Sequence, residues 1–224
     1  MNAVSRPDLA HIGVWLFDLD NTLYPAETEF MGLIEARMTE FMIRETGLPR
    51  DEARALQKRY LHEHGTTLAG LMAHHGVDPQ RFLDEVHDVS LDRISPDPDL
   101  DAALARLPGR LLVFTNGDGG HADRVLARLG IASRFEAVFH IGSGDYVPKP
   151  KPQAFARMIA DHAVDPRVTA FFEDSEKNLA PAADLGMTTV LVGAGAAAST
   201  APFIDYRTPA LAEFLTTARV KETP

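Results

Sequence analysis

Five short, mainly apolar runs recur along the chain, and polar or small residues follow each of them. The runs are Val14–Phe17, Leu111–Phe114, Ala137–Ile141, Val168–Phe172 and Thr188–Val192. Because apolar residues are continuous rather than alternating, we expect strands buried on both faces, as in a parallel sheet. A further edge strand is predicted at Phe203–Tyr206.

Amphipathic segments separate most of these runs and predict helices that cover the sheet. They are His121–Leu129, Pro152–Ala163 and Ser175–Leu185, with a last helix at Pro209–Leu215. Ser175 is a suitable N-cap, and Gly130 and Gly186 stand where glycine commonly ends a helix. The alternation of strands and helices predicts an α/β fold with a doubly wound parallel sheet.

The long interval between the first two runs breaks this alternation and has a helical pattern. The predicted helices are Glu27–Glu45, Arg50–His62, Leu68–His75, Gln80–Val89 and Leu100–Leu107. Pro49 is expected at the first helical position of the second helix, and Thr66 or Thr67 at the cap of the third. Because a parallel crossover normally needs one helix, we predict an all-helical cap domain over residues 23–95. It would be inserted into a core made of residues 1–22 and 96–224.

Composition narrows the classes of partner and chemistry. The 224 residues carry a formal net charge of −10, which disfavours a nucleic-acid polymer or an anionic membrane surface as partner. The chain has no cysteine, which excludes disulfides, a thiolate nucleophile and cysteine-ligated metal centres. The segment Met1–Ala10 has no long apolar stretch, so we expect neither a signal peptide nor a membrane span, and a cytoplasmic location. Nothing in the sequence specifies an oligomeric state.

Polar residues follow four of the predicted strands. They are Asp18 and Asp20 after the first, Thr115-Asn116-Gly117 after the second, Lys149 after the third and Glu173-Asp174-Ser175 after the fourth. Ligands of open α/β sheets bind outside the carboxyl ends of the strands, so we expect these groups to gather in one place. Prolines on both sides restrict the backbone of Lys149, which favours it over the nearby Lys151.

This set of groups suits a divalent metal ion and a phosphoryl group. Mg²⁺ prefers oxygen ligands, and Asp18, Asp174 and the backbone carbonyl of Asp20 are predicted to supply them. The metal and Lys149 would offset the charge of a phosphate. Its oxygens would be held by the Thr115 hydroxyl and the amides of Asn116 and Gly117. A pair of carboxylates also allows one to attack while the other transfers a proton.

Four motifs in this order resemble those of the haloacid dehalogenase superfamily, particularly its phosphatases. They are Asp18-Leu19-Asp20-Asn21-Thr22-Leu23, Thr115-Asn116-Gly117, Lys149 within Tyr146-Val147-Pro148-Lys149-Pro150, and Glu173-Asp174-Ser175. The resemblance implies a Rossmann-like core with a helical cap inserted after the first motif. It also implies that Asp18 forms an aspartyl-phosphate and that Asp20 is the general acid and then the general base. A carboxylate at position 20 favours phosphatases or phosphomutases over dehalogenases and transport ATPases.

The fourth motif departs from the pattern of many relatives. Asn178 stands where they carry a second aspartate, so Glu173 is expected to take over a supporting role near the metal. We therefore expect Asp174, rather than Asn178, to be the metal ligand from this motif.

Within the superfamily, the chain is similar to the pyrimidine 5′-nucleotidase-like phosphatases. The similar phrases are Phe17–Pro25, Tyr60 followed by His64-Gly65-Thr66-Thr67-Leu68, and Phe172-Glu173-Asp174-Ser175. The likeness implies a small phosphorylated metabolite as substrate, with the nucleoside 5′-monophosphates UMP and CMP first.

Three alternatives remain open on sequence alone. The same core also serves sugar phosphomutases, and a protein that only binds phosphorylated ligands would retain the same fold. Zinc is a further possible ligand, because several histidines fall in the predicted cap. They are His62, His64, His74, His75 and His87.

Overall fold

The computed structural model describes residues 6–221 and contains one six-stranded parallel sheet. The spatial order is β3-β2-β1-β4-β5-β6. The bounds are β1 Val14–Phe17, β2 Arg110–Phe114, β3 Ala137–Phe139, β4 Thr169–Glu173, β5 Thr188–Val192 and β6 Tyr206–Thr208. Residues 1–5 and 222–224 lie outside the described residues, and with them the start of the predicted 1–22 segment and of Met1–Ala10, and the end of the 96–224 segment.

Strand β1 is fully buried and lies at the centre of the sheet, between β2 and β4. Phe17 pairs in register with Val113 on β2 and with Phe172 on β4. The first residues beyond β1 therefore lie level with the ends of both neighbouring strands. This register brings three segments that are distant in the sequence to one edge of the sheet.

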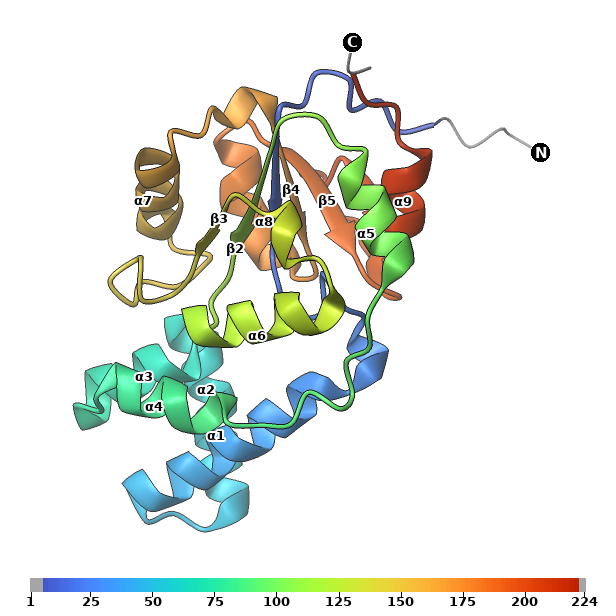
Figure 1. Cartoon of the computed structure of the whole chain (residues 1–224). Coiled ribbons are helices and arrows are strands. Elements are labelled where there is room, and N and C mark those ends of the chain that lie inside the picture. The colour runs from blue at the N-terminus through green and yellow to red at the C-terminus, as the bar shows by residue number, and fades with distance from the viewer. Residues whose placement is uncertain (1–5, 222–224) are drawn as a thin grey trace.

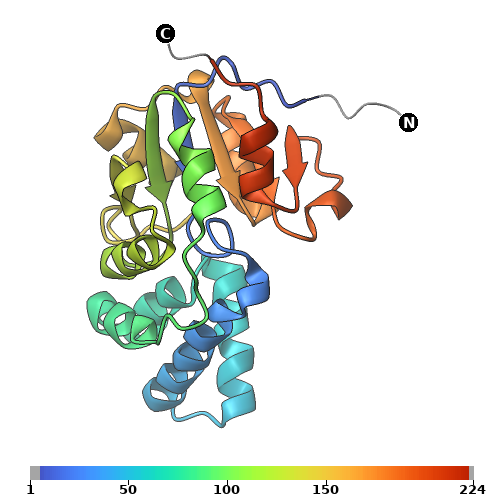
Figure 2. The ribbon, with the colours of Figure 1, turned by 45° about the vertical axis from the view of Figure 1, so that its right-hand side comes forward.

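Helices cover both faces of the sheet, which confirms the doubly wound α/β fold. The core helices are α5 Pro98–Ala105, α6 Gly119–Leu129, α7 Pro152–His162, α8 Glu176–Asp184 and α9 Leu211–Thr217. Helices α5 and α9 pack together on one face, and α7 and α8 lie on the other (Figure 2). Alternate residues of β1 pack on opposite faces of the sheet. Trp15 belongs to the hydrophobic cluster under α5 and α9, and Leu16 belongs to the cluster under α7 and α8.

Four helices between β1 and α5 form a separate group, which we call the helical insertion. They are α1 Phe30–Thr46, α2 Arg50–His64, α3 Thr67–His75 and α4 Pro79–His87. Helix α1 packs on α2 and α4, and α2 packs on α3. The group lies beyond the carboxyl ends of the strands, whose arrowheads point toward it (Figures 1 and 2). No helix within residues 6–221 is long and apolar enough to cross a membrane.

Local backbone geometry corrects three of the predicted boundaries. The helix predicted from Glu27 begins at Phe30, because Glu29 adopts a left-handed conformation with φ of 53° after a short 3-10 turn at Ala26–Thr28. Pro49 is the N-cap of α2 rather than its first helical residue. The third strand ends at Phe139 instead of Ile141, because the chain turns after His140.

The predicted edge strand Phe203–Tyr206 was also wrong in position, since β6 covers Tyr206–Thr208. The Asp205 carboxylate accepts a hydrogen bond from the Thr189 backbone amide at 2.9 Å. The Asp205 side chain therefore accepts the hydrogen bond that a main-chain carbonyl of the edge strand would accept in a regular β-ladder. Pairing with β5 starts only one residue later, at Tyr206.

Close packing of α3 on α2 depends on Gly70. A Cβ at this position would lie 2.3 Å from Cγ of Tyr60, which is buried in the insertion. We expect Gly70→Ala to lower the free energy of unfolding by about 1–3 kcal/mol, the usual cost of overpacking. Gly32→Ala in α1 is the matched control, because a Cβ there meets nothing within 4 Å. Denaturant unfolding should show the control unchanged or slightly stabilised; equal midpoints for the two variants would contradict this packing account.

Candidate active site

Lys149 lies at the centre of a buried ionic cluster at the carboxyl edge of the sheet. Its Nζ atom is 2.7 Å from Asp18 Oδ1, 2.7 Å from Glu173 Oε2 and 2.7 Å from the Phe114 carbonyl oxygen. An ammonium group has three protons, so these contacts use all of its donors. The side chain is 1% exposed, and it ties together the ends of β1, β2 and β4. Lys151, the alternative lysine, is exposed at the N-cap of α7.

Three carboxylates gather around this lysine. Oxygen atoms of Asp18, Glu173 and Asp174 lie within 4.8 Å of one another. Burial, and then repulsion from Glu173, raises the pKa of Asp18 to about 7. Burial likewise raises the pKa of Glu173 to about 7 and raises that of Asp174. One lysine does not neutralise three acids, so the cluster suits a further cation, and oxygen ligands in this number fit a hard divalent ion such as Mg²⁺.

The members of this acidic cluster differ in how free their oxygens are. Glu173 Oε2 accepts from Lys149, and Oε1 accepts from the Asn178 side chain at 3.1 Å. Asp174 is exposed, and its carboxylate lies beside the side chains of Asn21 and Glu173. Asp18 likewise accepts from Lys149 at Oδ1 and from Thr22 at Oδ2. The exposed Asp174 is therefore better placed than the buried Glu173 to hold a metal, and the part of Asp18 as a ligand stays a prediction. Asn178 is a donor to Glu173, so its contact with the cluster is indirect.

Asp20 is held by two donors that sequence reasoning missed. Its Oδ1 atom accepts from the Tyr24 hydroxyl at 2.6 Å and lies 2.9 Å from His121 Nε2. Burial alone would raise the pKa of Asp20, but the contacts with His121 and Tyr24 hold it below its ordinary value. Tyr24 follows the first motif, and His121 lies in the first turn of helix α6, after the second motif. Their closeness in sequence to the motifs was the available signal.

Asn116 joins two loops through its side chain rather than facing only the pocket. Its Oδ1 accepts from the backbone amide of Lys149 at 2.8 Å, and its Nδ2 donates to the carbonyl of the same residue at 3.2 Å. Thr115 is buried, and its hydroxyl accepts from the Gly117 amide at 2.8 Å. These bonds fix the loop after β2 and the loop carrying Lys149. Contact of Lys149, Thr115 and the two amides with a phosphate stays a prediction.

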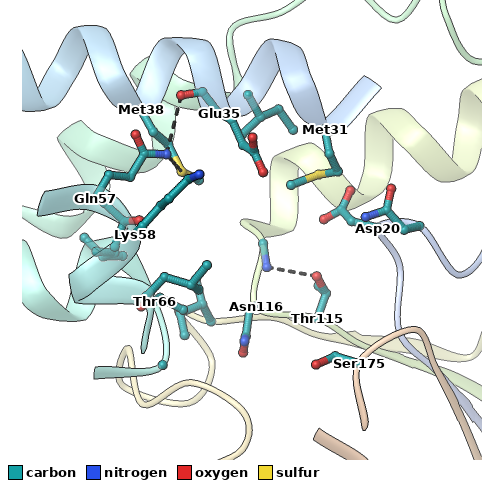
Figure 3. A pocket seen from close by; sticks show the side chains of 18 of the residues that line it. Asp20, Met31, Glu35, Met38, Gln57, Lys58, Thr66, Thr115, Asn116 and Ser175 are labelled. Carbon is teal, nitrogen blue, oxygen red and sulfur yellow. Dashed lines mark hydrogen bonds between the residues drawn. The ribbon is translucent and has the colours of Figure 1, made fainter. Parts of the chain in front are cut away.

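A cavity of about 630 Å³ lies between this edge of the sheet and the helical insertion. Figure 3 shows labelled side chains of the core and of the insertion around it. Those from the core are Asp20, Thr115, Asn116 and Ser175, and those from the insertion are Met31, Glu35, Met38, Gln57, Lys58 and Thr66. Any ligand in the cavity that reaches Asp18 therefore lies within range of insertion side chains.

Histidines of the insertion contact one another and Tyr60 in pairs. His64 and His74 lie with their Nε2 atoms 3.2 Å apart, and His75 contacts the Tyr60 hydroxyl at 2.9 Å. Within residues 6–221, the grouping with metal-ligand geometry contains the three carboxylates and no histidine. The zinc alternative thus lacks a group of three histidine or acidic ligands in the insertion among these residues.

The sequence model of the haloacid dehalogenase-like hydrolases matches residues 12–186. The chain belongs to this family. The match includes β1 through α8, and therefore every residue of the ionic cluster and the whole helical insertion.

Individual proteins resemble the chain in sequence or in fold at low identity. Phosphate metabolism protein 8 of Saccharomyces cerevisiae is 29% identical over an alignment of 194 residues, and the match covers 80% of this chain and 60% of that protein. The chain thus spans less than two thirds of this relative. Among solved structures, a haloacid dehalogenase phosphatase from Thermococcus onnurineus has a TM-score of 0.60 at 21% identity, covering 93% of this chain and 100% of that one.

The structural neighbours include a dehalogenase as well as the phosphatase. The L-2-haloacid dehalogenase of Xanthobacter autotrophicus has a TM-score of 0.56 at 19% identity, covering 92% of this chain and 97% of that one. The hydrolase YfnB of Bacillus subtilis, solved with bound magnesium, has a TM-score of 0.58 at 16% identity, with coverages of 92% and 97%. The fold alone does not choose between these chemistries, so the choice depends on the residues of the site.

Proposed function

We propose that this haloacid dehalogenase-like hydrolase is a Mg²⁺-dependent phosphomonoester phosphatase. The observation that carries the proposal is the pair Asp18 and Asp20, which line one cavity and are held by different partners. Lys149 fixes Asp18, while Tyr24 and His121 fix Asp20. One carboxylate is thus poised to attack and a second is available for proton transfer, which is the division of roles that phosphoryl transfer through an enzyme carboxylate requires.

In the proposed reaction, an Asp18 oxygen forms a bond to phosphorus while the bond from phosphorus to the leaving oxygen breaks. Asp20 gives its proton to that oxygen, so the alcohol leaves neutral. A phosphate brings negative charge beside Asp20, which favours the protonated acid. Asp20 then takes a proton from a water that attacks phosphorus, and the bond between phosphorus and Asp18 breaks. Inorganic phosphate leaves and both carboxylates return to their starting state.

Mg²⁺ would be held by Asp18, Asp174 and the backbone carbonyl of Asp20, and it would supply positive charge to the transferring phosphoryl group. Lys149 orients Asp18 and favours its ionised form, and Glu173 keeps Lys149 in place. The Thr115 hydroxyl and the amides of Asn116 and Gly117 are proposed to bind phosphate oxygens. Asn178 supports this arrangement through Glu173.

We propose that residues 23–95 form a cap domain over a core of residues 1–22 and 96–224. The helical insertion lies across the carboxyl edge of the sheet and lines the cavity, which supports this division. A cavity of about 630 Å³ falls within the range that small-molecule ligands occupy. The first substrates to test are nucleoside 5′-monophosphates, UMP and CMP ahead of others. A cytoplasmic location, and the lack of a nucleic-acid or membrane partner, stay predictions from composition and charge.

A phosphate-release screen over nucleotides, sugar phosphates and small phosphate esters tests the proposal. We expect release from at least one ester, with Mg²⁺ present. Isomerised sugar phosphate without net release would instead identify a phosphomutase. Binding without turnover by any ester would identify a phospho-ligand binding protein and contradict the proposal.

Metal dependence gives a separate prediction. Chelation by EDTA should abolish phosphate release, and added Mg²⁺ should restore it. Asp174→Asn should raise the Mg²⁺ concentration for half-maximal activity by about 10–100-fold, because one ligand loses its charge. Asp184→Asn, at an exposed position in α8, is the matched control and should titrate like the wild type. Full activity in EDTA would contradict the metal assignment.

A further inference from the structure

Two buried histidine rings stack where the helical insertion meets the core. His87 is the last residue of α4, and His121 lies in the first turn of α6. Their ring centroids are 4.3 Å apart, and the ring planes are within 13° of parallel. Burial lowers the pKa of His87 to about 4, so its ring is uncharged near neutral pH. The stack therefore does not bring two cations face to face.

Further contacts hold this junction in place. The ring of Phe30, the first residue of α1, lies parallel to His121 with centroids 6.0 Å apart. Arg124 of α6 donates from Nη2 to the backbone carbonyl of His87. The insertion and the core thus contribute residues to one packed group around His121, whose side chain is 0% exposed.

His121 leaves one oxygen of Asp20 available for chemistry. Its Nε2 and the Tyr24 hydroxyl both contact Asp20 Oδ1. The other oxygen, Oδ2, is on the side of Gly117, where a Cβ would lie 3.4 Å from it and 3.2 Å from Thr115 Oγ1. Asp20 Oδ2 therefore faces the loop that is proposed to bind phosphate.

This arrangement has an energetic cost that packing alone does not explain. Nδ1 of His121 is buried without a hydrogen-bond partner among residues 6–221. Leaving a buried polar atom unpaired carries a desolvation cost that an apolar side chain would avoid. Unpaired polar atoms in native proteins call for a reason such as a role in catalysis.

We infer that His121 is a positioning residue for Asp20 and that His87 holds His121 from the helical insertion. The inference rests on the proposed function. His121 ties down Oδ1, so that the proton on Oδ2 is directed at the leaving oxygen. Because His87 belongs to the insertion, the orientation of the acid depends on where the insertion sits.

The test compares esters that differ in their need for a proton. p-Nitrophenolate leaves readily without protonation, whereas an alkoxide does not. The measured quantity is kcat/KM, which covers the steps up to transfer of the phosphoryl group. The esters are p-nitrophenyl phosphate and the most active alkyl phosphate of the screen, for which UMP is the first candidate. We expect His121→Phe to lower kcat/KM about 10–100-fold for the alkyl ester and less than about threefold for the aryl ester.

Two further variants separate positioning from folding. His121→Gln keeps a donor near the position of Nε2 and should restore most of the alkyl-ester activity. His87→Ala removes the stacked ring without touching Asp20, and it should lower the alkyl-ester value about 3–10-fold while sparing the aryl ester. If His121→Phe does not fold, the His87→Ala comparison decides. His11→Phe, at an exposed position, is the control and should change neither value.

The outcomes distinguish this inference from the function on which it rests. Equal losses on both esters in His121→Phe and His87→Ala would show a merely structural role and overturn the inference. If Asp20→Asn itself lowers kcat/KM equally for the aryl and the alkyl ester, Asp20 is not the general acid. The inference then fails together with that role. Selective loss in Asp20→Asn without selective loss in the histidine variants would overturn the inference alone.

Discussion

Replacing Asp18 by asparagine should lower the rate of phosphate release by about 10⁴-fold or more, because an amide oxygen is a poor nucleophile toward phosphorus. Thr115 and Lys149 cannot take over this role, since the first is a bonded hydroxyl and the second a protonated amine. Asp174 lies close by, but Lys149 and Thr22 orient Asp18 and not Asp174. Initial rates with saturating Mg²⁺ measure the effect.

The matched control for this variant is Asp184→Asn, which makes the same chemical change on an exposed turn of α8. It should keep full activity. Both variants should unfold cooperatively, so that a loss in Asp18→Asn is not a loss of fold. A residual rate within tenfold of the wild type would show that another group attacks phosphorus.

Replacing Lys149 by methionine should destabilise the protein as well as inactivate it. Methionine is similar in length, but it leaves Asp18 and Glu173 buried without their shared cation. Removing one partner of a buried ion pair typically costs about 3–5 kcal/mol. We therefore expect a loss of this size in the free energy of unfolding, measured by denaturant in EDTA. Added Mg²⁺ should recover part of it, because a bound cation stabilises the folded state.

Lys151→Met is the control for this second prediction. Lys151 is two residues away and exposed, with no ion pair among the described residues. It should change stability by less than about 0.5 kcal/mol and leave activity intact. Equal effects of the two methionine variants would contradict the central position of Lys149.

The fold was predictable because its signals are local and mutually consistent. Val14–Phe17 and Thr188–Val192 were predicted with the bounds that the structure shows, because their apolar residues are continuous and flanked by polar ones. The helical insertion was predicted because its caps are explicit: Thr66 and Asp78 accept hydrogen bonds from the first turns of α3 and α4. The position of β6 was not predictable, because it depends on the contact of Asp205 with β5.

The gathering of Asp18, Lys149, Glu173 and Asp174 was also predictable in outline. Parallel strands present their carboxyl ends at one edge, so residues that follow different strands meet there. The order of these residues in the sequence does not reveal which of their side chains form hydrogen bonds with one another. The three donations of Lys149 and the bridge from Asn116 depend on distances between loops that no local pattern encodes.

His121, which contacts Asp20, and His87, which stacks on His121, were missed for a related reason. His121 reads as an ordinary helix residue, and His87 as one of several histidines in the insertion. Their stack joins residues 34 positions apart, from two parts of the fold. Nothing in the spacing of either residue pairs it with the other, or His121 with Asp20.

The most direct test of the proposed mechanism is to look for a phosphoryl group on Asp18. Asp20→Asn should slow hydrolysis of the aspartyl-phosphate, so the intermediate should accumulate during turnover of p-nitrophenyl phosphate with Mg²⁺. Acid quenching and peptide mass spectrometry should then find one added phosphoryl group on the peptide that contains Asp18, and none when Asp18→Asn is added to the same variant. Unmodified peptide in Asp20→Asn, together with equal phosphate release by the wild type and Asp18→Asn, would contradict the account.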